Sequence, residues 1–239
     1  MPVVVFASSK GGPGKSTAAV LLATQLALKG ASVTAIDADP NRPLSQWALL
    51  PGCPKNLTVL AAVSEATIIE VIEGAAQRTT FVVVDLEGTA SMAVAYAVSR
   101  ADLVIVPTQG SQLDAIEAAK AVKLIRQQEK AFGRTIPYAI LFTRTNAAIR
   151  PRTLRHIREE FQKHNVPSLR TQIQEREAFR AIFSFGGTLE SLDVSQVSNK
   201  DAAIKNAREL AGEILTLLRQ NADSSAEPSE EPELDQEVA

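Results

Sequence analysis

The sequence predicts an α/β fold in which helices cover both faces of a mostly parallel, twisted sheet, giving three layers. Short apolar runs alternate with longer stretches of helical periodicity along most of the 239 residues, 45% of which are apolar. The runs are rich in β-branched residues, as in strands buried on both faces. Strands that alternate with helices need crossover connections, which place the helices on either side of the sheet. A chain of this length fits a single domain.

Each expected element follows from the periodicity of its segment. We expect buried strands at residues 3–7, 33–36, 81–84, 103–106 and 138–142, and helices at 15–29, 65–76, 90–99, 114–132 and 151–163. A short apolar element at 169–173 leads into a helix at 175–185, which two glycines end, and a last helix spans about 200–220. Ligands bind such folds at the carboxyl ends of the strands, so the loops there form the candidate site.

The segment that follows the first expected strand is a phosphate-binding loop. Its sequence is Lys10-Gly11-Gly12-Pro13-Gly14-Lys15-Ser16-Thr17. The glycines let the backbone aim its N–H groups at phosphate oxygens, and the following helix adds its positive N-terminal dipole. Lys15 is placed to reach the β- and γ-phosphates, and the Ser16 hydroxyl to ligate Mg²⁺. The order of strand, loop, Lys-Ser and helix therefore predicts a nucleotide site rather than an ordinary turn.

Carboxylates follow the second and third expected strands. Asp37 and Asp39 lie one residue apart, so an extended chain places both on the same face. Asp85 ends the run Phe81-Val82-Val83-Val84, which has the form of a Walker B strand, and is expected to hold Mg²⁺ through water or Ser16. Gly88 allows a close backbone approach near the γ-phosphate. Placing a water and neutralising charge supply most of the catalysis of phosphoryl transfer, and these residues suit both tasks.

The loop resembles the deviant P-loop of the ParA/MinD superfamily of ATPases, because Ser9 replaces the first glycine of the common pattern and Lys10 adds an early lysine. The resemblance implies that ATP and Mg²⁺ are the ligands. It implies that Lys10 crosses a dimer interface to the nucleotide of the other subunit. It also implies that Asp39 orients the attacking water and that Asp37 supports the magnesium shell. Glu87 stands where the family commonly has proline, and no role is assigned to it.

In detail, the chain is most similar to short partition ATPases of the ParF type and to VirC-type proteins of DNA-transfer plasmids. The similarity covers roughly residues 1–220 and is strongest at residues 39–47, 107–114 and 170–176. In ParF-like relatives the place that Thr143 and Arg144 take here lies beside the adenine. This implies that both residues contact the base, although an ordinary strand end explains them about equally well.

Charge divides the chain into two parts. Residues 222–239 contain seven acidic side chains and no Lys or Arg, whereas residues 1–221 contain 25 basic and 20 acidic ones. We therefore expect an ATPase domain at 1–221 and a disordered acidic tail at 222–239, because the tail cannot bury enough apolar surface to fold. Cys53 alone excludes a disulfide framework and suits a reduced cytosol. No stretch approaches the roughly 18 apolar residues of a membrane span, so we expect a cytoplasmic protein.

The basic excess lies mainly at residues 134–208, which hold 13 basic and 7 acidic side chains. Such a surface suits nucleic acid, although a solvated helix face explains the charge equally well. In ParA proteins, basic residues near the C-terminus bind DNA without sequence preference. The resemblance therefore implies DNA contacts by Arg176 and Lys200, which Lys205 and Arg208 could extend. An anionic membrane would repel the acidic tail, so DNA is the expected surface and membrane is not.

The resemblance as a whole implies an ATP-dependent homodimer that associates with the nucleoid and binds DNA non-specifically. A ParB- or ParG-like partner would stimulate its weak ATP hydrolysis, and the cycle would segregate or position a plasmid. Two alternatives remain open at this point. One is a VirC-type factor that recruits the machinery of conjugative DNA processing, and the other is the positioning of a protein cargo.

Overall fold

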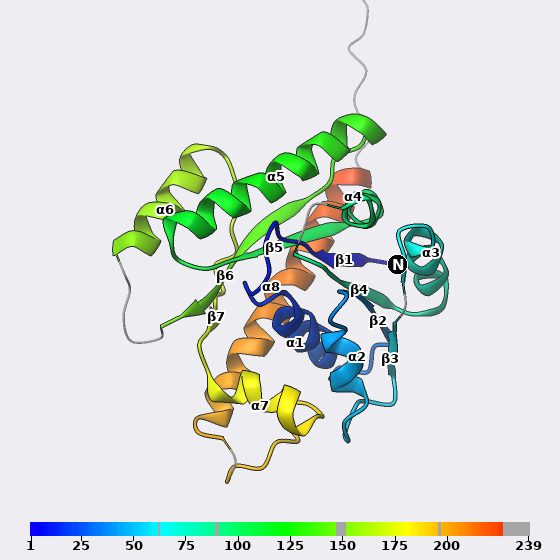
Figure 1. The fold of residues 1–239 in the computed structure, drawn as a ribbon, viewed down its shortest axis with the longest axis vertical. Helices are drawn as coiled ribbons and strands as arrows, with labels where there is room; N and C mark the ends of the chain where they lie inside the picture. The colour runs from blue at the N-terminus through cyan, green and yellow to red at the C-terminus, as the bar shows by residue number, and fades with distance from the viewer. Residues whose placement is uncertain (62, 89–90, 147–151, 196, 227–239) are drawn as a thin grey trace, which may run out of the picture.

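The computed structural model describes residues 1–61, 63–88, 91–146, 152–195 and 197–226. In these residues seven parallel strands form one sheet in the order β3-β2-β4-β1-β5-β6-β7 (Figure 1). The strands are β1 (Val3–Phe6), β2 (Val33–Ala38), β3 (Leu57–Leu60), β4 (Phe81–Leu86), β5 (Leu103–Thr108), β6 (Tyr138–Thr145) and β7 (Ile173–Gln174). The parallel sheet expected from the sequence is confirmed.

Helices cover both faces of the sheet. They are α1 (Lys15–Leu28), α2 (Pro43–Ala48), α3 (Ile68–Arg78), α4 (Met92–Ser99), α5 (Gln112–Phe132), α6 (Arg152–Lys163), α7 (Glu177–Phe185) and α8 (Lys200–Ala226). One hydrophobic core joins the sheet to α1, α2, α7 and α8, and a second core joins it to α3, α4, α5 and α6 (Figure 1). The predicted three-layer architecture is therefore confirmed as well.

Strand β1 shows why these segments read as continuous apolar runs. Val4 and Phe6 belong to the core on the α1 side, whereas Val3 and Val5 belong to the core on the α5 side. All four are at most 4% exposed. A strand buried on both faces needs apolar residues at every position, so its sequence does not alternate.

The order of the strands determines where a ligand can bind. Strand β1 lies between β4 and β5, while β2 lies on the far side of β4. The chain therefore leaves β1 toward one edge of the sheet and later continues toward the other. Such a reversal opens a crevice at the carboxyl ends of the strands, where ligands of open α/β sheets bind. The loops after β1, β2 and β4 meet there.

Strand β3 and helix α2 were not expected from the sequence. Strand β3 has four residues at the edge of the sheet, pairs with β2, and exposes Thr58, so it lacks the apolar character of a central strand. Helix α2 has six residues, of which Leu44 and Trp47 are buried. Segments this short give little periodic signal.

The last helix extends beyond its expected end. Helix α8 runs to Ala226, past the expected domain boundary at 221, and the Ser224 hydroxyl donates to the Gln220 carbonyl at 2.8 Å. Residues 227–239 of the expected tail lie outside the described residues, as do the expected helix starts at 90 and 151. Among the helices that the structure describes, none combines the length and the apolar character needed to cross a membrane.

Candidate active site

A glycine-rich loop connects the carboxyl end of β1 to the first turn of α1. Gly12 and Gly14 have φ angles of 87° and 90°, a left-handed conformation that favours glycine. No side chain caps the first turn of α1, which begins at Lys15. Backbone N–H groups at the start of a helix have no partner within it, and the helix dipole is positive there. The loop and the helix together therefore form a site for a phosphate group.

Lys15 extends beneath this loop and is only 4% exposed. Its ammonium group donates to the Ser8 hydroxyl at 3.1 Å and to the Lys10 carbonyl at 3.4 Å. Burial lowers the pKa of the ammonium, while the carboxylates of Asp85 and Asp39 act in the opposite direction. A buried cation with neutral hydrogen-bond partners is well placed to bind an anion that enters the loop.

Asp85 is completely buried at the end of β4, where it lies opposite Phe6 on one neighbouring strand and Asp37 on the other. Neither of its carboxylate oxygens accepts a geometrically well-formed hydrogen bond. Burial raises the pKa of this carboxyl to about 7, against the opposing effects of the nearby Ser16 hydroxyl and Lys15 ammonium. A buried carboxylate without partners is costly, so Asp85 either keeps its proton or takes a cation as its partner.

The two aspartates at the end of β2 have different environments. Asp37 is 2% exposed, and its Oδ2 atom accepts hydrogen bonds from the Ser45 backbone N–H and hydroxyl, both at 2.7 Å. Its Oδ1 atom is buried and has no hydrogen-bond partner. Asp39 is half-buried, and its Oδ1 atom accepts from the Asn41 backbone N–H at 2.8 Å and side-chain amide at 3.0 Å. Residues of the loop after β2 and of the first turn of α2 thus orient both carboxylates.

The donor set at this edge fits Mg²⁺. Three buried oxygens, two of Asp85 and one of Asp37, have no hydrogen-bond partner, and Ser16 lies beside Asp85. The described residues contain no group of three or more His, Cys, Asp or Glu side chains able to hold a metal alone. Mg²⁺ usually binds one or two carboxylates and completes its shell with water and substrate phosphates. The metal would therefore be held together with a nucleotide.

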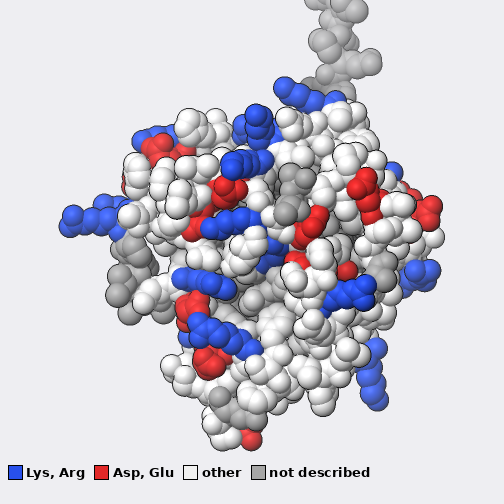
Figure 2. Space-filling model, viewed as in Figure 1, with Lys and Arg blue, Asp and Glu red and all other residues white. Residues whose placement is uncertain are grey.

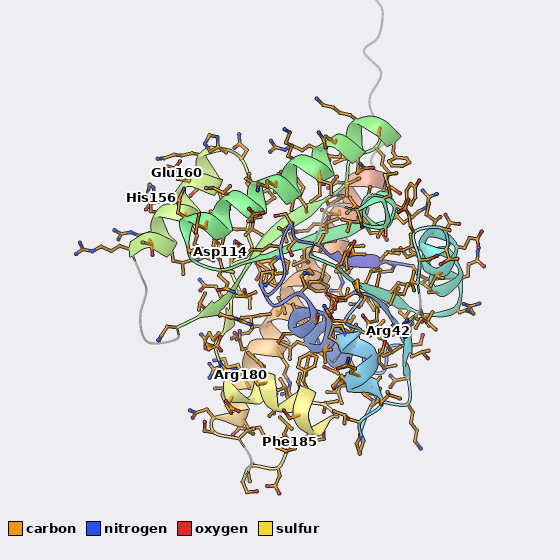
Figure 3. All side chains as sticks on the ribbon, viewed as in Figure 1. Arg42, Asp114, His156, Glu160, Arg180 and Phe185 are labelled. Atoms are coloured by element: carbon orange, nitrogen blue, oxygen red, sulfur yellow. The ribbon has the colours of Figure 1, made fainter. Side chains whose placement is uncertain are left out.

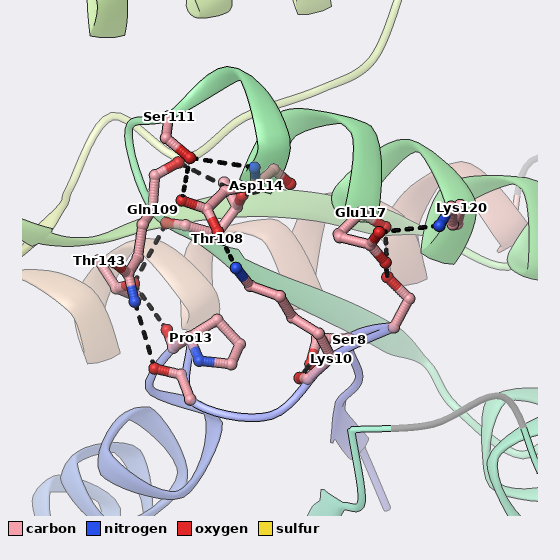
Figure 4. Close-up of polar contacts among 12 residues, drawn as sticks. Ser8, Lys10, Pro13, Thr108, Gln109, Ser111, Asp114, Glu117, Lys120 and Thr143 are labelled. Carbon is pink, nitrogen blue, oxygen red and sulfur yellow. Dashed lines mark hydrogen bonds and ion pairs between the residues drawn. The ribbon is translucent and has the colours of Figure 1, made fainter.

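Lys10 points away from the loop that it begins (Figure 4). Its ammonium group forms an ion pair with Asp114 in the first turn of α5, and 42% of its side chain remains exposed. Burial would raise the pKa of Asp114, but the contacts with Lys10 and Ser111 outweigh this effect and lower it. Lys10 therefore lies at the surface, where it forms an ion pair with a carboxylate of its own subunit.

Helix α5 also holds the loop, a role that could not be seen in the sequence. The Ser111 hydroxyl caps α5 by accepting from the Asp114 backbone N–H at 3.2 Å. One turn later, the Ser9 hydroxyl contacts the backbone carbonyl and the carboxylate of Glu117, both at 2.7 Å. The spacing of Ser111 and Asp114 resembles a capping box and marks the start of a helix, but it does not reveal that the helix meets the P-loop.

Gly88 brings the loop after β4 into direct contact with the P-loop. A Cβ atom at this position would lie 2.3 Å from the Lys10 carbonyl carbon and 2.4 Å from the Gly11 nitrogen. Both atoms are backbone and cannot move independently. The glycine expected to permit a close approach near the phosphates therefore lies against the P-loop itself.

Thr143 and Arg144 lie at the other end of the P-loop. Thr143 is 1% exposed, and its hydroxyl contacts the carbonyls of Pro13 at 2.6 Å and Thr108 at 3.1 Å. This side chain therefore supports the loop. Arg144 is exposed, with a φ of 51° and its guanidinium 4.0 Å from Glu175.

A small pocket of about 70 Å³ lies beside these residues, next to the P-loop. Gly14, Thr17 and Arg144 line it together with Arg176 and Arg180, the latter on α7 (Figure 3). At this volume the pocket is too small to hold a whole nucleoside, so it marks only the edge of the space beside the P-loop. Arg176, expected to bind DNA, thus lies at the candidate nucleotide site, where it donates to Gln174.

The other three residues expected to bind DNA lie on α8 and already have partners. Lys200 donates to the backbone carbonyls of Glu190, at 2.8 Å, and Leu192. Arg208 pairs with Glu190 at 3.2 Å, and Lys205 lies 4.0 Å from Glu209. Glu190 thus contacts both Lys200 and Arg208, while Asn206, next to Lys205, donates to the Gln172 carbonyl and accepts from the Gln174 backbone N–H.

Comparison with known proteins agrees with this geometry. A model of the VirC1 protein family matches residues 1–221. ParA from Rhizobium radiobacter is 44% identical over 211 residues, which cover 88% of this chain and 95% of the relative. VirC1 from Rhizobium rhizogenes is 27% identical over 187 residues, which cover 76% of this chain and 80% of the relative.

Solved structures share the fold at low sequence identity. McdA from Cyanothece, without ligand, has a TM-score of 0.70 at 16% identity and covers 87% of this chain and 99% of its own. A Borrelia burgdorferi plasmid partition protein bound to AMPPNP has a TM-score of 0.67 at 19% identity, and the match covers 90% of this chain and 99% of that protein. MinD from Aquifex aeolicus has a TM-score of 0.68 at 19% identity, and the match covers 90% of this chain and 98% of that protein.

The contact of Gly88 with the P-loop predicts a defect in nucleotide binding. The Gly88→Ala variant should bind nucleotide at least about 10-fold more weakly, because its Cβ displaces the loop and contacts at such sites tolerate little misplacement. Gly212→Ala on α8 is the control, since a Cβ there meets no atom within 4 Å. Equal affinities of the two variants in a nucleotide titration would contradict the proposed contact.

The raised pKa of Asp85 predicts how stability depends on pH in the absence of nucleotide and metal. The folded state binds a proton on Asp85 up to about pH 7, whereas an unfolded Asp releases it near the ordinary pKa of 3.8, so stability falls as pH rises through this window. Between about pH 5.5 and about pH 7 this group should remove about 2 kcal/mol from the free energy of unfolding.

Urea unfolding of the wild type and of Asp85→Asn at both pH values measures this effect. The wild type should lose more stability than the variant as pH rises. The same loss in both proteins would show that Asp85 is ionised throughout.

Proposed function

Because the chain belongs to the VirC1 family, within the ParA/MinD superfamily of P-loop ATPases, we propose that it is an Mg²⁺-dependent ATPase that dimerises on binding ATP. In this proposal the ATP-bound dimer binds DNA without sequence preference and associates with the nucleoid. A ParB- or ParG-like adaptor on the cargo stimulates hydrolysis and releases the dimer. The 44% identity to ParA over most of both chains supports plasmid partition as the setting.

The residues of the site have separate tasks in this proposal. The P-loop backbone and Lys15 bind the phosphates, and Ser16, Asp85 and Asp37 hold Mg²⁺. When bound, the metal neutralises phosphate charge. Asp39 orients the water that attacks the terminal phosphate, and its contacts with Asn41 fix its direction. Thr17 and Arg144, which line the small pocket beside the P-loop, are proposed to contact the nucleoside.

The position of Lys10 is the observation that carries the proposed dimerisation. Lys15 already occupies the space beneath the P-loop, so the site has a lysine of its own. Lys10 instead lies near the surface on Asp114, with 42% of its side chain exposed. An exchange of Asp114 for the triphosphate of a second subunit gives Lys10 a more highly charged partner. ATP then contributes to the contact between subunits, and loss of its terminal phosphate weakens that contact.

This proposal predicts that Lys10→Ala separates ATP binding from dimerisation. The variant should bind a slowly hydrolysed ATP analogue within about threefold of the wild type, because Lys15 is intact, yet sediment as a monomer. Lys29→Ala, at an exposed lysine after α1, is the matched control and should dimerise normally. A Lys10→Ala dimer that forms as readily as the wild type would refute the proposed role.

Asp39→Ala should separate ATP binding from hydrolysis. Removing the group that orients the water should slow single-turnover hydrolysis by at least about 100-fold, while ATP stays bound and the dimer persists on DNA. Asn41→Ala should have a smaller effect in the same direction, because it removes only the contacts that direct Asp39. Hydrolysis by Asp39→Ala at the wild-type rate would rule out this assignment.

The match to the VirC1 family supports a second candidate function. In this version the ATP-bound protein recruits DNA-processing machinery to a site of conjugative transfer, and assembly matters more than turnover. Sequence-selective DNA binding, or a requirement for a relaxase in DNA retention, would favour it over partition.

A further inference from the structure

Basic side chains are unevenly distributed over the helices of the two outer layers. Helices α5 and α6 together carry eight Lys and Arg and five acidic residues. One of these acids, Asp114, is buried at the P-loop and does not belong to the outer surface. Helices α7 and α8 carry five basic and five acidic residues. The cationic excess therefore lies on α5 and α6, on the opposite face of the sheet from the α8 residues that the sequence suggested.

Lys123, Arg126 and Lys130 form an exposed cationic row on α5. Positions three and seven residues apart lie on one side of a helix, so the row extends over about 10 Å. Within the described residues, Lys123 and Lys130 make no ion pair or hydrogen bond. Arg126 makes one hydrogen bond with its guanidinium, to the Tyr138 hydroxyl at 3.1 Å. In contrast, Lys200, Lys205 and Arg208 on α8 all have partners.

The acids near this row already have local partners, which are cations for Glu159 and Glu160 and a neutral backbone amide for Glu129. Glu160 on α6 binds Lys163 at 2.7 Å, and Glu159 lies 3.8 Å from Arg155. The Glu129 carboxylate accepts from the Ile136 backbone N–H at 2.9 Å. Figure 2 shows Lys and Arg side chains over α5 and α6 with a few acidic ones beside them, and basic and acidic side chains that alternate near α7. Figure 3 shows His156 and Glu160 on α6.

The row borders a groove of about 630 Å³ between α5 and α6. The rim of the groove includes Lys123, Arg126 and Lys130, and its lining includes Phe161 and His164. The free cations are spread along the rim and do not converge on one point. Such an arrangement suits an extended polyanion that runs across both helices more than a single small anion.

We propose that this α5–α6 face, defined by the cationic row of Lys123, Arg126 and Lys130 on α5, contacts the phosphate backbone of duplex DNA. The inference rests on the proposed ATP-dependent DNA binding and assigns it a surface other than α8. The contacts are to phosphates, so they carry no sequence information and weaken with salt. An acidic protein segment is the competing occupant, since the groove also has apolar walls.

Two charge-matched double variants test this assignment. Lys123→Glu/Lys130→Glu reverses the free cations of α5, and Lys205→Glu/Arg208→Glu reverses the paired cations of α8. The probe is a fluorescent duplex of random sequence, titrated in the presence of Mg²⁺ and a slowly hydrolysed ATP analogue. The α5 variant should bind the duplex at least about 10-fold more weakly. The slope of its log affinity against log salt concentration should correspond to about two fewer phosphate contacts than in the wild type. The α8 variant should bind within about threefold of the wild type.

Sedimentation with the same analogue separates this inference from the proposed function. Both variants should dimerise like the wild type, because neither pair touches the P-loop. If Lys123→Glu/Lys130→Glu impairs dimerisation, the neutral variant Lys123→Gln/Lys130→Gln is tested in its place. A loss of DNA affinity in dimers of that variant supports the assignment. DNA binding that is lost in the α8 variant but kept in the α5 variant overturns it. If wild-type dimers bind no duplex, the inference about DNA is also overturned, and an acidic protein becomes the expected occupant of the α5–α6 face. The proposed ATP-dependent dimerisation is not affected by that result.

Discussion

The candidate site depends on opposite charges that are buried together without a full set of partners. Asp85 is completely buried and Lys15 nearly so, and both oxygens of Asp85 lack well-formed hydrogen bonds. Such groups are costly unless something pairs with them. A magnesium ion with a phosphate chain supplies both signs of charge at once. The protein holds this arrangement in place through Gly88 below the P-loop and Thr143 beside it.

Much of this site could be predicted because its chemistry is local in the sequence. The P-loop, Asp37 and Asp85 each follow an apolar run directly, and parallel strands bring their carboxyl ends to one edge. The partner of Lys10 could not be predicted, because Asp114 lies more than 100 residues away and the contact depends on how α5 packs. For the same reason, the sequence did not show that Arg176 lines the small pocket beside the P-loop, or that Lys200, Lys205 and Arg208 on α8 already have partners.

Helix α5 connects the candidate site with the proposed DNA surface. Its first turn holds Lys10 through Asp114, and its second holds Ser9 through Glu117. Its middle carries Lys123 and, about two turns on, Lys130, neither of which has an ion pair within the described residues. One helix thus contacts the P-loop and also presents the cationic row. In the proposed cycle, release of Lys10 on dimerisation would act on the helix that is proposed to face DNA.

Lys10 is proposed to exchange Asp114 for a triphosphate on a second subunit. A crystal structure of the protein with Mg²⁺ and a slowly hydrolysed ATP analogue provides the decisive test. We expect a dimer in which each Lys10 ammonium contacts the phosphates bound by its partner and no longer contacts Asp114. A structure in which Lys10 still pairs with Asp114 of its own chain, while the triphosphate fills the P-loop of a dimer, would contradict it.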